Sequence, residues 1–277
     1  MNASIDSSRG RTWFAALTGA SASLPGYSGA MLVADAELAG QKARYIAVVP
    51  DQGNRFPRVR NGAVGLIEGW EIAKAVQEVV TQDRDSGRKT AIVAVIDVAS
   101  QAYGRREEGY GIHQSLAAAA GAYASARLAG HAVIGLIVGK AISGAFLAHG
   151  YQANRLIALD DDGVMIHAMG KQSAARITMR TVEALESLAA TVPPMAYDIA
   201  NYASLGLLWR LLAVSSADSP LAADVRQVGQ ALREALADIL ASPDRGLTTR
   251  LHAVNRQATQ TVHERMRSQW RTDVPVH

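Results

Sequence analysis

The sequence HAVIGLIVGKAISGAFLAHG, residues 131–150, decides the fold, because an apolar run leads directly into a turn and a helix. Residues 133–138 are aliphatic except for Gly135, which is typical of a buried strand. Ser143 follows as a candidate N-cap, and Gly144 and Ala145 then begin a compact helix. The stretch therefore predicts a strand, a tight turn and a short helix in succession.

Small side chains at the start of this helix leave the backbone N–H groups of Gly144 and Ala145 unshielded. The first N–H groups of a helix have no partner within it and lie at the positive end of its dipole, so they can hold an oxyanion such as a thioester enolate. Ordinary packing through small residues produces the same pattern, so the residues alone leave both interpretations open. The turn has neither the GxxxxGK[ST] frame of a phosphate-binding loop nor a GxGxxG motif.

Short apolar runs alternate with helical stretches along most of the chain. Gly, Asp or Asn residues bound the predicted strands, which lie at residues 31–34, 45–49, 92–97, 133–138, 156–159 and 164–166. Apolar residues at helical spacing predict helices over residues 67–82 and 112–129. Strands that alternate with helices indicate an α/β fold with parallel strands and helical crossovers.

We divide the chain into a loosely ordered N-terminal arm, residues 1–29, a main domain, residues 30–214, and a C-terminal helical hairpin, residues 215–277. The arm is rich in Ser, Gly and Ala and has one short apolar anchor, Trp13 and Phe14.

The hairpin prediction rests on two apolar stripes that advance by three and four residues. They run over residues 221–240 and 247–266, with a Pro- and Gly-containing turn between them. Residues 244–277 carry six arginines and three acidic residues, which equals the net charge of +3 of the whole chain. This charge indicates a solvated helix face or a docking surface for an acidic carrier protein.

Composition excludes several classes of protein. The 277 residues include no cysteine, so the chain forms no disulfide, thiolate zinc site or iron–sulfur cluster and has no cysteine nucleophile. Aromatic residues make up only 5% of the chain, and with a charge of +3 this speaks against nucleic-acid binding. The polar start and interrupted apolar runs predict neither a signal peptide nor a membrane span, and we expect a cytoplasmic protein.

Further motifs accompany the glycine-bearing turn. They are NRFPR at 54–58, SQAYGRREE at 100–108, GIHQS at 111–115 and PPMAYDIANYASLG at 193–206. With GKAISGAFLAH at 139–149, they resemble the crotonase superfamily, within it the α-type half of acyl-CoA carboxyltransferases, and most specifically the γ subunits of biotin-independent malonate decarboxylases. The resemblance covers the chain from about Asp35 to Ala213.

This resemblance implies a crotonase-like fold, a spiral of ββα units, here followed by the C-terminal hairpin. It implies a carboxy-lyase that works with a β subunit, in which malonyl held as a thioester on an acyl carrier protein loses CO₂ and becomes the acetyl thioester. The thioester is carried on a phosphopantetheine-like arm of the carrier protein. The expected partners are therefore the β subunit and the acyl carrier protein, and this chain is expected to bind no cofactor, no biotin and no metal.

By position, the resemblance assigns the oxyanion donors to the backbone of Gly144 and Ala145. A second donor falls on the loop after the preceding strand, at Ser100 or Gln101. Substrate binding is assigned to Gly139, Ser143, Arg105, Arg106 and Gln114. The two arginines could grip an anion through bidentate contacts, or they could belong to a self-neutralising surface loop.

Several alternatives remain open at this point. The chain could be the α-type carboxyltransferase subunit of a biotin-dependent acyl-CoA carboxylase, although Ile142 narrows the turn where such enzymes often have Gly and leaves less room for biotin. It could also be a non-catalytic scaffold whose partner holds every essential group.

His113, His149 and His167 lie near the turn or a strand end, where hydrogen-bonded structural histidines are the more common case. The run at residues 160–163 is interpreted as a turn and not as a calcium loop.

Overall fold

A sheet of seven strands forms the centre of the protein in our computed structural model, which describes residues 8–244, 246–251 and 253–270. The strands are β1 (Met31–Leu38), β2 (Gln41–Val48), β3 (Ala91–Val98), β4 (Val133–Ile142), β5 (Arg155–Asp160), β6 (Met165–His167) and β7 (Arg210–Ala213). Their order is β1-β2-β3-β4-β5-β7, and the short β6 pairs with the end of β4. Strand β1 pairs with β2 in antiparallel orientation, and all other neighbouring strands pair in parallel.

The predicted strands are all present, because parallel strands buried on both faces produce the continuous apolar runs that the sequence displays. Strand β7 was not predicted. It is only four residues long and half-buried, so it lacks both the length and the apolar run that identify the other strands.

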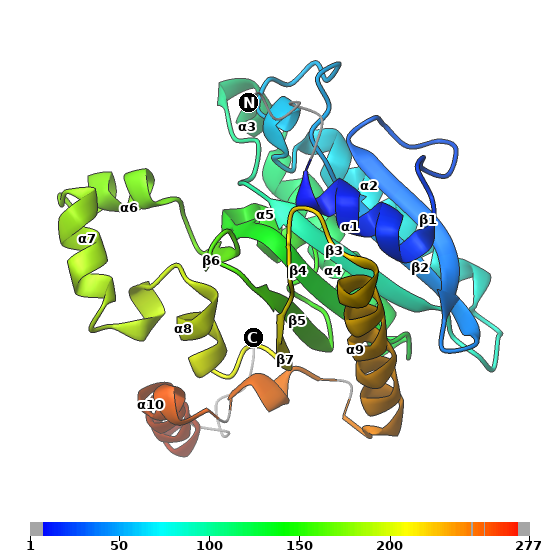
Figure 1. The fold of residues 1–277 in the computed structure, drawn as a ribbon. Helices are drawn as coiled ribbons and strands as arrows, with labels where there is room; N and C mark the ends of the chain where they lie inside the picture. Colours follow the sequence, from blue (N-terminus) through cyan, green and yellow to red (C-terminus); the bar gives the residue numbers. More distant parts are fainter. Residues whose placement is uncertain (1–7, 245, 252, 271–277) are drawn as a thin grey trace, which may run out of the picture.

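Helices cover both faces of the sheet (Figure 1). Helices α2 (Leu66–Gln82) and α4 (Ile112–Leu128) pack together on one face, and both match their predicted ranges closely. Helices α1 (Arg9–Thr18) and α9 (Ala222–Ala241) lie on the other face. The remaining helices are α3 (Arg105–Gly109), α5 (Ser143–Ala148), α6 (Lys171–Ile177), α7 (Val182–Ala189), α8 (Ile199–Ser204) and α10 (Gln257–Gln269). No helix of the described chain is long and apolar enough to span a membrane.

The predicted loose arm contains helix α1, which is an integral part of the fold. Trp13 and Phe14 are fully buried, as expected of an anchor, and the Trp13 indole N–H donates to the carbonyl of Ala217 at 2.8 Å. Ser8 caps the helix by accepting from the N–H of Arg11. This ten-residue helix was not predicted because the arm is rich in Ser and Gly and because few apolar residues lie on the buried face of the helix. Residues 1–7 of the arm lie outside the described residues.

The C-terminal hairpin prediction is wrong in its second half. Helix α9 matches the first apolar stripe, but the second stripe begins with two 3₁₀ turns, Thr248–Leu251 and Val254–Arg256, and becomes α-helical only in α10. Helices α9 and α10 do not run side by side: α9 packs on α1 and the sheet, whereas α10 lies near α8 (Figure 1). Residues 245, 252 and 271–277 of the predicted hairpin lie outside the described residues.

Strand β4 bulges just before the glycine-bearing turn. The pairing of β3 with β4 shifts between Ile96 and Val98, so that Asp97 faces Gly139. The Asp97 carboxylate accepts hydrogen bonds from the N–H groups of Gly10 (3.2 Å) and Lys140 (3.1 Å). A Cβ atom on Gly139 would lie 2.2 Å from Oδ1 of Asp97. The absent side chain at Gly139 therefore makes room for the half-buried carboxylate of Asp97, and the predicted contact of Gly139 with substrate stays a prediction.

Candidate functional site

Strand β4 enters helix α5 through a strained turn, residues 142–145, which we call the Gly144 turn. Ile142 occupies the N-cap position in extended conformation, and Ser143 is the first helical residue with a φ of 65°. The prediction of Ser143 as N-cap is therefore wrong by one residue. A non-glycine residue in the left-handed region costs on the order of 1–3 kcal/mol and is most often found at functional sites.

The backbone N–H of Gly144 is engaged by a side chain of the neighbouring loop. It donates to Oε1 of Gln101 at 2.9 Å. The structure thus brings together the two segments that the sequence assigned to the oxyanion hole. It differs from the prediction in that the carbonyl oxygen of the Gln101 side chain accepts the N–H of Gly144, which was predicted to be free for an oxyanion.

The loop after β3 is fixed by Val64. The N–H of Val64 donates to the carbonyl of Ser100 at 3.0 Å, and the N–H of Ala102 donates to the carbonyl of Val64 at 2.7 Å. Among the described residues, nothing accepts a hydrogen bond from the N–H groups of Ser100 and Gln101. The loop holds these two backbone donors in place, but neither residue lines the cavity beside the Gly144 turn, so their role as the second donor stays a prediction.

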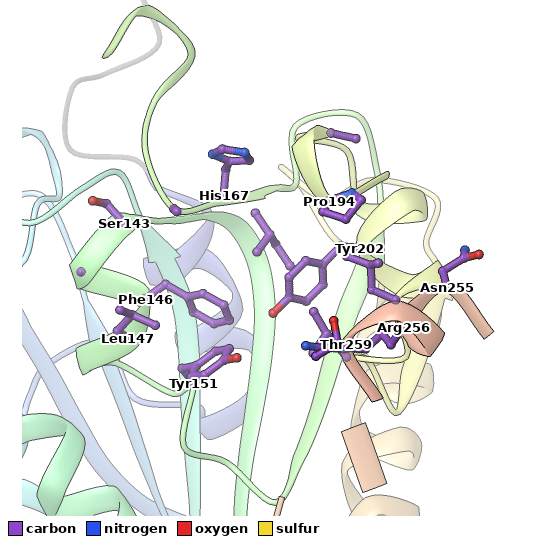
Figure 2. Close-up of a pocket in the computed structure, with 16 residues that line it drawn as sticks. Ser143, Phe146, Leu147, Tyr151, His167, Pro194, Tyr202, Asn255, Arg256 and Thr259 are labelled. Carbon is purple, nitrogen blue, oxygen red and sulfur yellow. The ribbon is translucent and has the colours of Figure 1, made fainter. Parts of the chain in front are cut away.

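A cavity of about 600 Å³ opens beside the Gly144 turn. Figure 2 shows Phe146 of α5 and Tyr202 of α8 pointing toward one another across it. It is lined by Ser143, Gly144, Phe146, Leu147, Tyr151, Ile166, His167, Ala168, Pro194, Ala196, Tyr202, Leu205, Leu207, Asn255, Arg256 and Thr259. The wall is largely apolar, and its far side is built by the C-terminal segment that was predicted to be part of a hairpin.

Tyr202 places an unpartnered hydroxyl in this cavity. The oxygen is buried and has no hydrogen-bond partner within the described part of the chain. Burial raises the pKa of this phenol, so the group stays protonated at neutral pH and can donate a hydrogen bond.

His167 flanks the Gly144 turn, because β6 pairs with β4 so that His167 lies opposite Ile142. Its ring stacks on Tyr197 with 3.9 Å between centroids, and Nδ1 lies 3.0 Å from the carbonyl oxygen of Met169. Burial lowers the pKa of this imidazole, so it is neutral at pH 7. Sequence reasoning did not include His167 in the site; its position at the end of a short strand was the available signal.

The other predicted site residues lie elsewhere. Arg105, Arg106 and Gln114 are exposed on α3 and α4 and do not line the cavity. Arg106 borders a separate hollow of about 510 Å³ together with Arg55, Phe56, Leu66 and Tyr110. The methyl group of Ala145 is buried in the core, which leaves only its backbone as a candidate donor.

Two further predictions assigned a structural role and not a functional one, to His149 and to the run at residues 160–163. His149 is fully buried, with Nε2 3.0 Å from the carbonyl of Val95 and Nδ1 3.1 Å from the Tyr123 hydroxyl, so its structural interpretation is confirmed. The run at residues 160–163 is a turn between β5 and β6, as predicted, and Asp161 in it pairs with Arg9. In the described ranges no three His, Asp or Glu side chains converge on a possible metal site.

Solved structures with a similar fold include malonate decarboxylase assemblies. A Pseudomonas malonate decarboxylase hetero-tetramer in complex with coenzyme A contains a chain 62% identical to this one, with a TM-score of 0.93, covering 95% of this chain and 100% of that chain. A Pseudomonas MdcD–MdcE hetero-dimer contains a chain 59% identical, with a TM-score of 0.88 and coverages of 95% and 99%. Transcarboxylase 12S, at 18% identity, a TM-score of 0.62 and coverages of 85% and 46%, shares the fold. The predicted crotonase-like carboxyltransferase fold is thereby confirmed.

A characterised relative is the malonyl-S-ACP:biotin-protein carboxyltransferase MADD of Malonomonas rubra. The two proteins are 39% identical over 145 residues, which make up 51% of this chain and 50% of the relative. The chain thus spans about half the length of that relative. The family model for the malonate decarboxylase gamma subunit matches residues 59–270. The chain therefore belongs to the family of malonate decarboxylase gamma subunits.

Proposed function

We propose that this chain pairs with a β subunit and provides half of a site that decarboxylates malonyl thioesters. The substrate is malonyl on the phosphopantetheine-like arm of an acyl carrier protein, and the products are CO₂ and the acetyl thioester. The Pseudomonas relatives support this proposal, because they are parts of malonate decarboxylase assemblies and one of these is a hetero-dimer. A cytoplasmic location and independence from biotin belong to the same proposal.

The observation that carries the proposal is the hydrogen bond from the Gly144 N–H to Gln101. It demonstrates that this N–H is directed at an external carbonyl oxygen and not at its own helix. On substrate binding, an oxygen of the malonyl thioester replaces Oε1 of Gln101. The bond from the α-carbon to the carboxylate breaks, its electron pair moves into the thioester enolate, and the α-carbon then takes up a proton. One positioned donor contributes about 3–4 kcal/mol to such a step.

The cavity suits this chemistry because decarboxylation needs no nucleophile. Among the described residues that line the cavity, Arg256 is the one whose side chain ordinarily carries a charge. Nδ1 of His167 also lies 3.2 Å from the backbone nitrogen of Met169, and when it accepts that N–H the neutral ring carries its proton on Nε2. In this tautomer His167 can donate one hydrogen bond to the thioester oxygen without adding a cation that would stabilise the reactant carboxylate.

Two variants in the complex with the β subunit test this role. Gly144→Val covers the N–H and should lower kcat by about 10²–10³ while the complex still assembles. Gln101→Ala retains the backbone donor and removes the competing oxygen, so it should leave kcat within about threefold and lower KM. Gly121→Ala is a matched control, because a Cβ there meets nothing within 4 Å. Loss of assembly in Gly144→Val together with an unchanged KM in Gln101→Ala would favour a scaffold role instead.

Carboxyl transfer to a biotin protein is the second candidate function. The Malonomonas rubra relative supports it, since its name describes that transfer. The two functions differ in one readout. In the first, malonyl carrier protein becomes the acetyl form and releases CO₂ without biotin; in the second, it becomes the acetyl form only when a biotin protein is present to accept the carboxyl group.

A further inference from the structure

A second pocket of about 300 Å³ lies away from the Gly144 turn, between strand β5, the segment before β7, helix α9 and the 3₁₀ turn Thr248–Leu251. Its polar lining residues are Asn154, Arg155, Asp238, Thr249 and Arg250. The proposed function leaves these groups without a role. Their charges and hydrogen bonds are not balanced, which makes the pocket a candidate binding site.

Arg250 is a buried cation without a carboxylate partner. Its side chain is 6% exposed, and its guanidinium donates to the backbone carbonyls of Tyr151, at 2.7 Å, and Ala153. Among the described residues no carboxylate lies within 4.0 Å of it. Burial, with a smaller effect of neighbouring arginines, lowers the pKa of this group to about 10, so it remains charged at pH 7. A buried charge is costly unless it is paired.

Asn154, which lines the same pocket, carries an unused hydrogen-bond donor. Its side chain is 2% exposed, and Oδ1 accepts from the N–H of Val133 at 3.0 Å. This bond fixes the orientation of the carboxamide. The Nδ2 atom is buried and has no partner within the described residues. A buried donor left without an acceptor costs about 1–3 kcal/mol, so the site is incomplete as it stands.

Arg155 supplies the second cation, and Asp238 compensates only one of the two. Arg155 is buried, and its Nε donates to Oδ2 of Asp238 at 2.5 Å. Asp238 is about half exposed. The pocket therefore contains two guanidinium groups, one carboxylate and one free amide donor, so donors and positive charge are both in excess.

We propose that this pocket binds a compact oxyanion, of the phosphate or small dicarboxylate class, between Arg250, Arg155 and the amide of Asn154. Such a ligand accepts several hydrogen bonds from planar guanidinium groups and neutralises the unpaired charge. The pocket is large enough, since 300 Å³ corresponds to roughly ten water molecules.

Binding there should also stabilise one wall of the larger cavity. Leu207 lines both cavities, and the Arg250 guanidinium lies 5.5 Å from the ring centroid of Tyr151, which lines the larger one. Arg250 holds the 3₁₀ turn against the chain at Tyr151, and the wall residues Asn255 and Arg256 lie four and five residues beyond the last residue of that turn. An anion that orders Arg250 therefore orders this wall.

The test is thermal unfolding of the full chain with increasing phosphate or malonate, against chloride at matched ionic strength. We expect a saturating rise in Tm with at least one of the two oxyanions, and a dissociation constant of about 1 mM or lower. The stronger of the two identifies the ligand class. Arg88→Gln, an exposed arginine on the loop before β3, should respond as the unaltered chain does. Equal melting curves in phosphate, malonate and chloride would overturn the proposal.

Asn154→Asp is the decisive variant, because it places a carboxylate where the free amide donor now lies and preserves the Oδ1 acceptor for Val133. The new carboxylate should act as an internal anion. We therefore expect a higher Tm without added ligand and at least about a fivefold loss of oxyanion affinity. A variant that is less stable and still responds to the oxyanion as before would contradict the site. The readout requires no activity. Because malonate can also bind in the larger cavity, only the part of the rise in Tm that Asn154→Asp removes is assigned to this pocket, which separates the site from the proposed function.

Discussion

Gly139→Ala tests whether the glycine before the turn serves the fold or the substrate. An added Cβ would lie 2.2 Å from Oδ1 and 2.6 Å from Cγ of Asp97, so the carboxylate would have to move. Moving it breaks the hydrogen bonds from the N–H groups of Gly10 and Lys140. These bonds connect helix α1 and the β4 bulge to strand β3.

The expected cost follows from those two bonds. Each hydrogen bond to a charged group contributes about 1.5–3 kcal/mol, and the stiffer unfolded chain of an alanine variant recovers about 1 kcal/mol. The net loss of unfolding free energy is therefore about 2–5 kcal/mol. For a chain of this size it corresponds to a Tm lower by roughly 6–15 °C.

Urea and thermal unfolding of four chains measure this effect: unaltered, Gly139→Ala, Asp97→Ala and the double variant. Removing the Asp97 carboxylate removes the clash, so Gly139→Ala should cost less than about 1 kcal/mol in the Asp97→Ala background. Gly121→Ala, in open space on helix α4, should be stabilising by about 0.5–1 kcal/mol. An equal cost of Gly139→Ala with and without Asp97 would refute the reasoning.

Three further predictions concern buried or site residues. Burial lowers the pKa of His149 from 6.5 to about 4, so on acidification the histidine of the unfolded chain is protonated at a higher pH than that of the folded chain. Protonation therefore favours unfolding, and the unfolding free energy should fall by about 3 kcal/mol from pH 7 to pH 4. In urea titrations, His149→Leu should show a smaller loss of unfolding free energy over this pH range. Trp13→Ala should cost about 3–5 kcal/mol in urea unfolding, whereas the half-exposed Trp70→Ala costs less than about 1 kcal/mol; similar values would mean that α1 is not part of the core. In the complex with the β subunit, His167→Gln keeps a neutral donor and should retain more activity than His167→Ala, by about tenfold in kcat; equal rates would exclude a hydrogen bond from this residue to the reacting group.

The central sheet could be predicted from the sequence because buried parallel strands are continuous apolar runs. Helix α1 could not be predicted from the sequence, because its burial depends on the long-range contact of Trp13 with Ala217. The second C-terminal helix was predicted from an apolar stripe, but the stripe at residues 254–266 is largely exposed. Periodicity records which residues share a helix face, but not whether another element covers that face.

For the site, the sequence identified the two segments that meet, at Gln101 and Gly144. It could not indicate that the glutamine side chain occupies the Gly144 N–H, because that depends on a rotamer and on a contact between residues 43 positions apart. His167 and Tyr202 were missed for the same reason. Their positions in the cavity follow from the pairing of β6 with β4 and the packing of α8, which local sequence patterns do not encode.

The shared site is tested most directly by measuring CO₂ release from malonyl carrier protein, without biotin, for this chain, its β subunit and their mixture. The account predicts release by the mixture alone, and a rate for the Gly144→Val mixture that is lower by about 10²–10³ although the complex forms normally. Full release by either subunit alone, or an undiminished rate in the Gly144→Val complex, would contradict it.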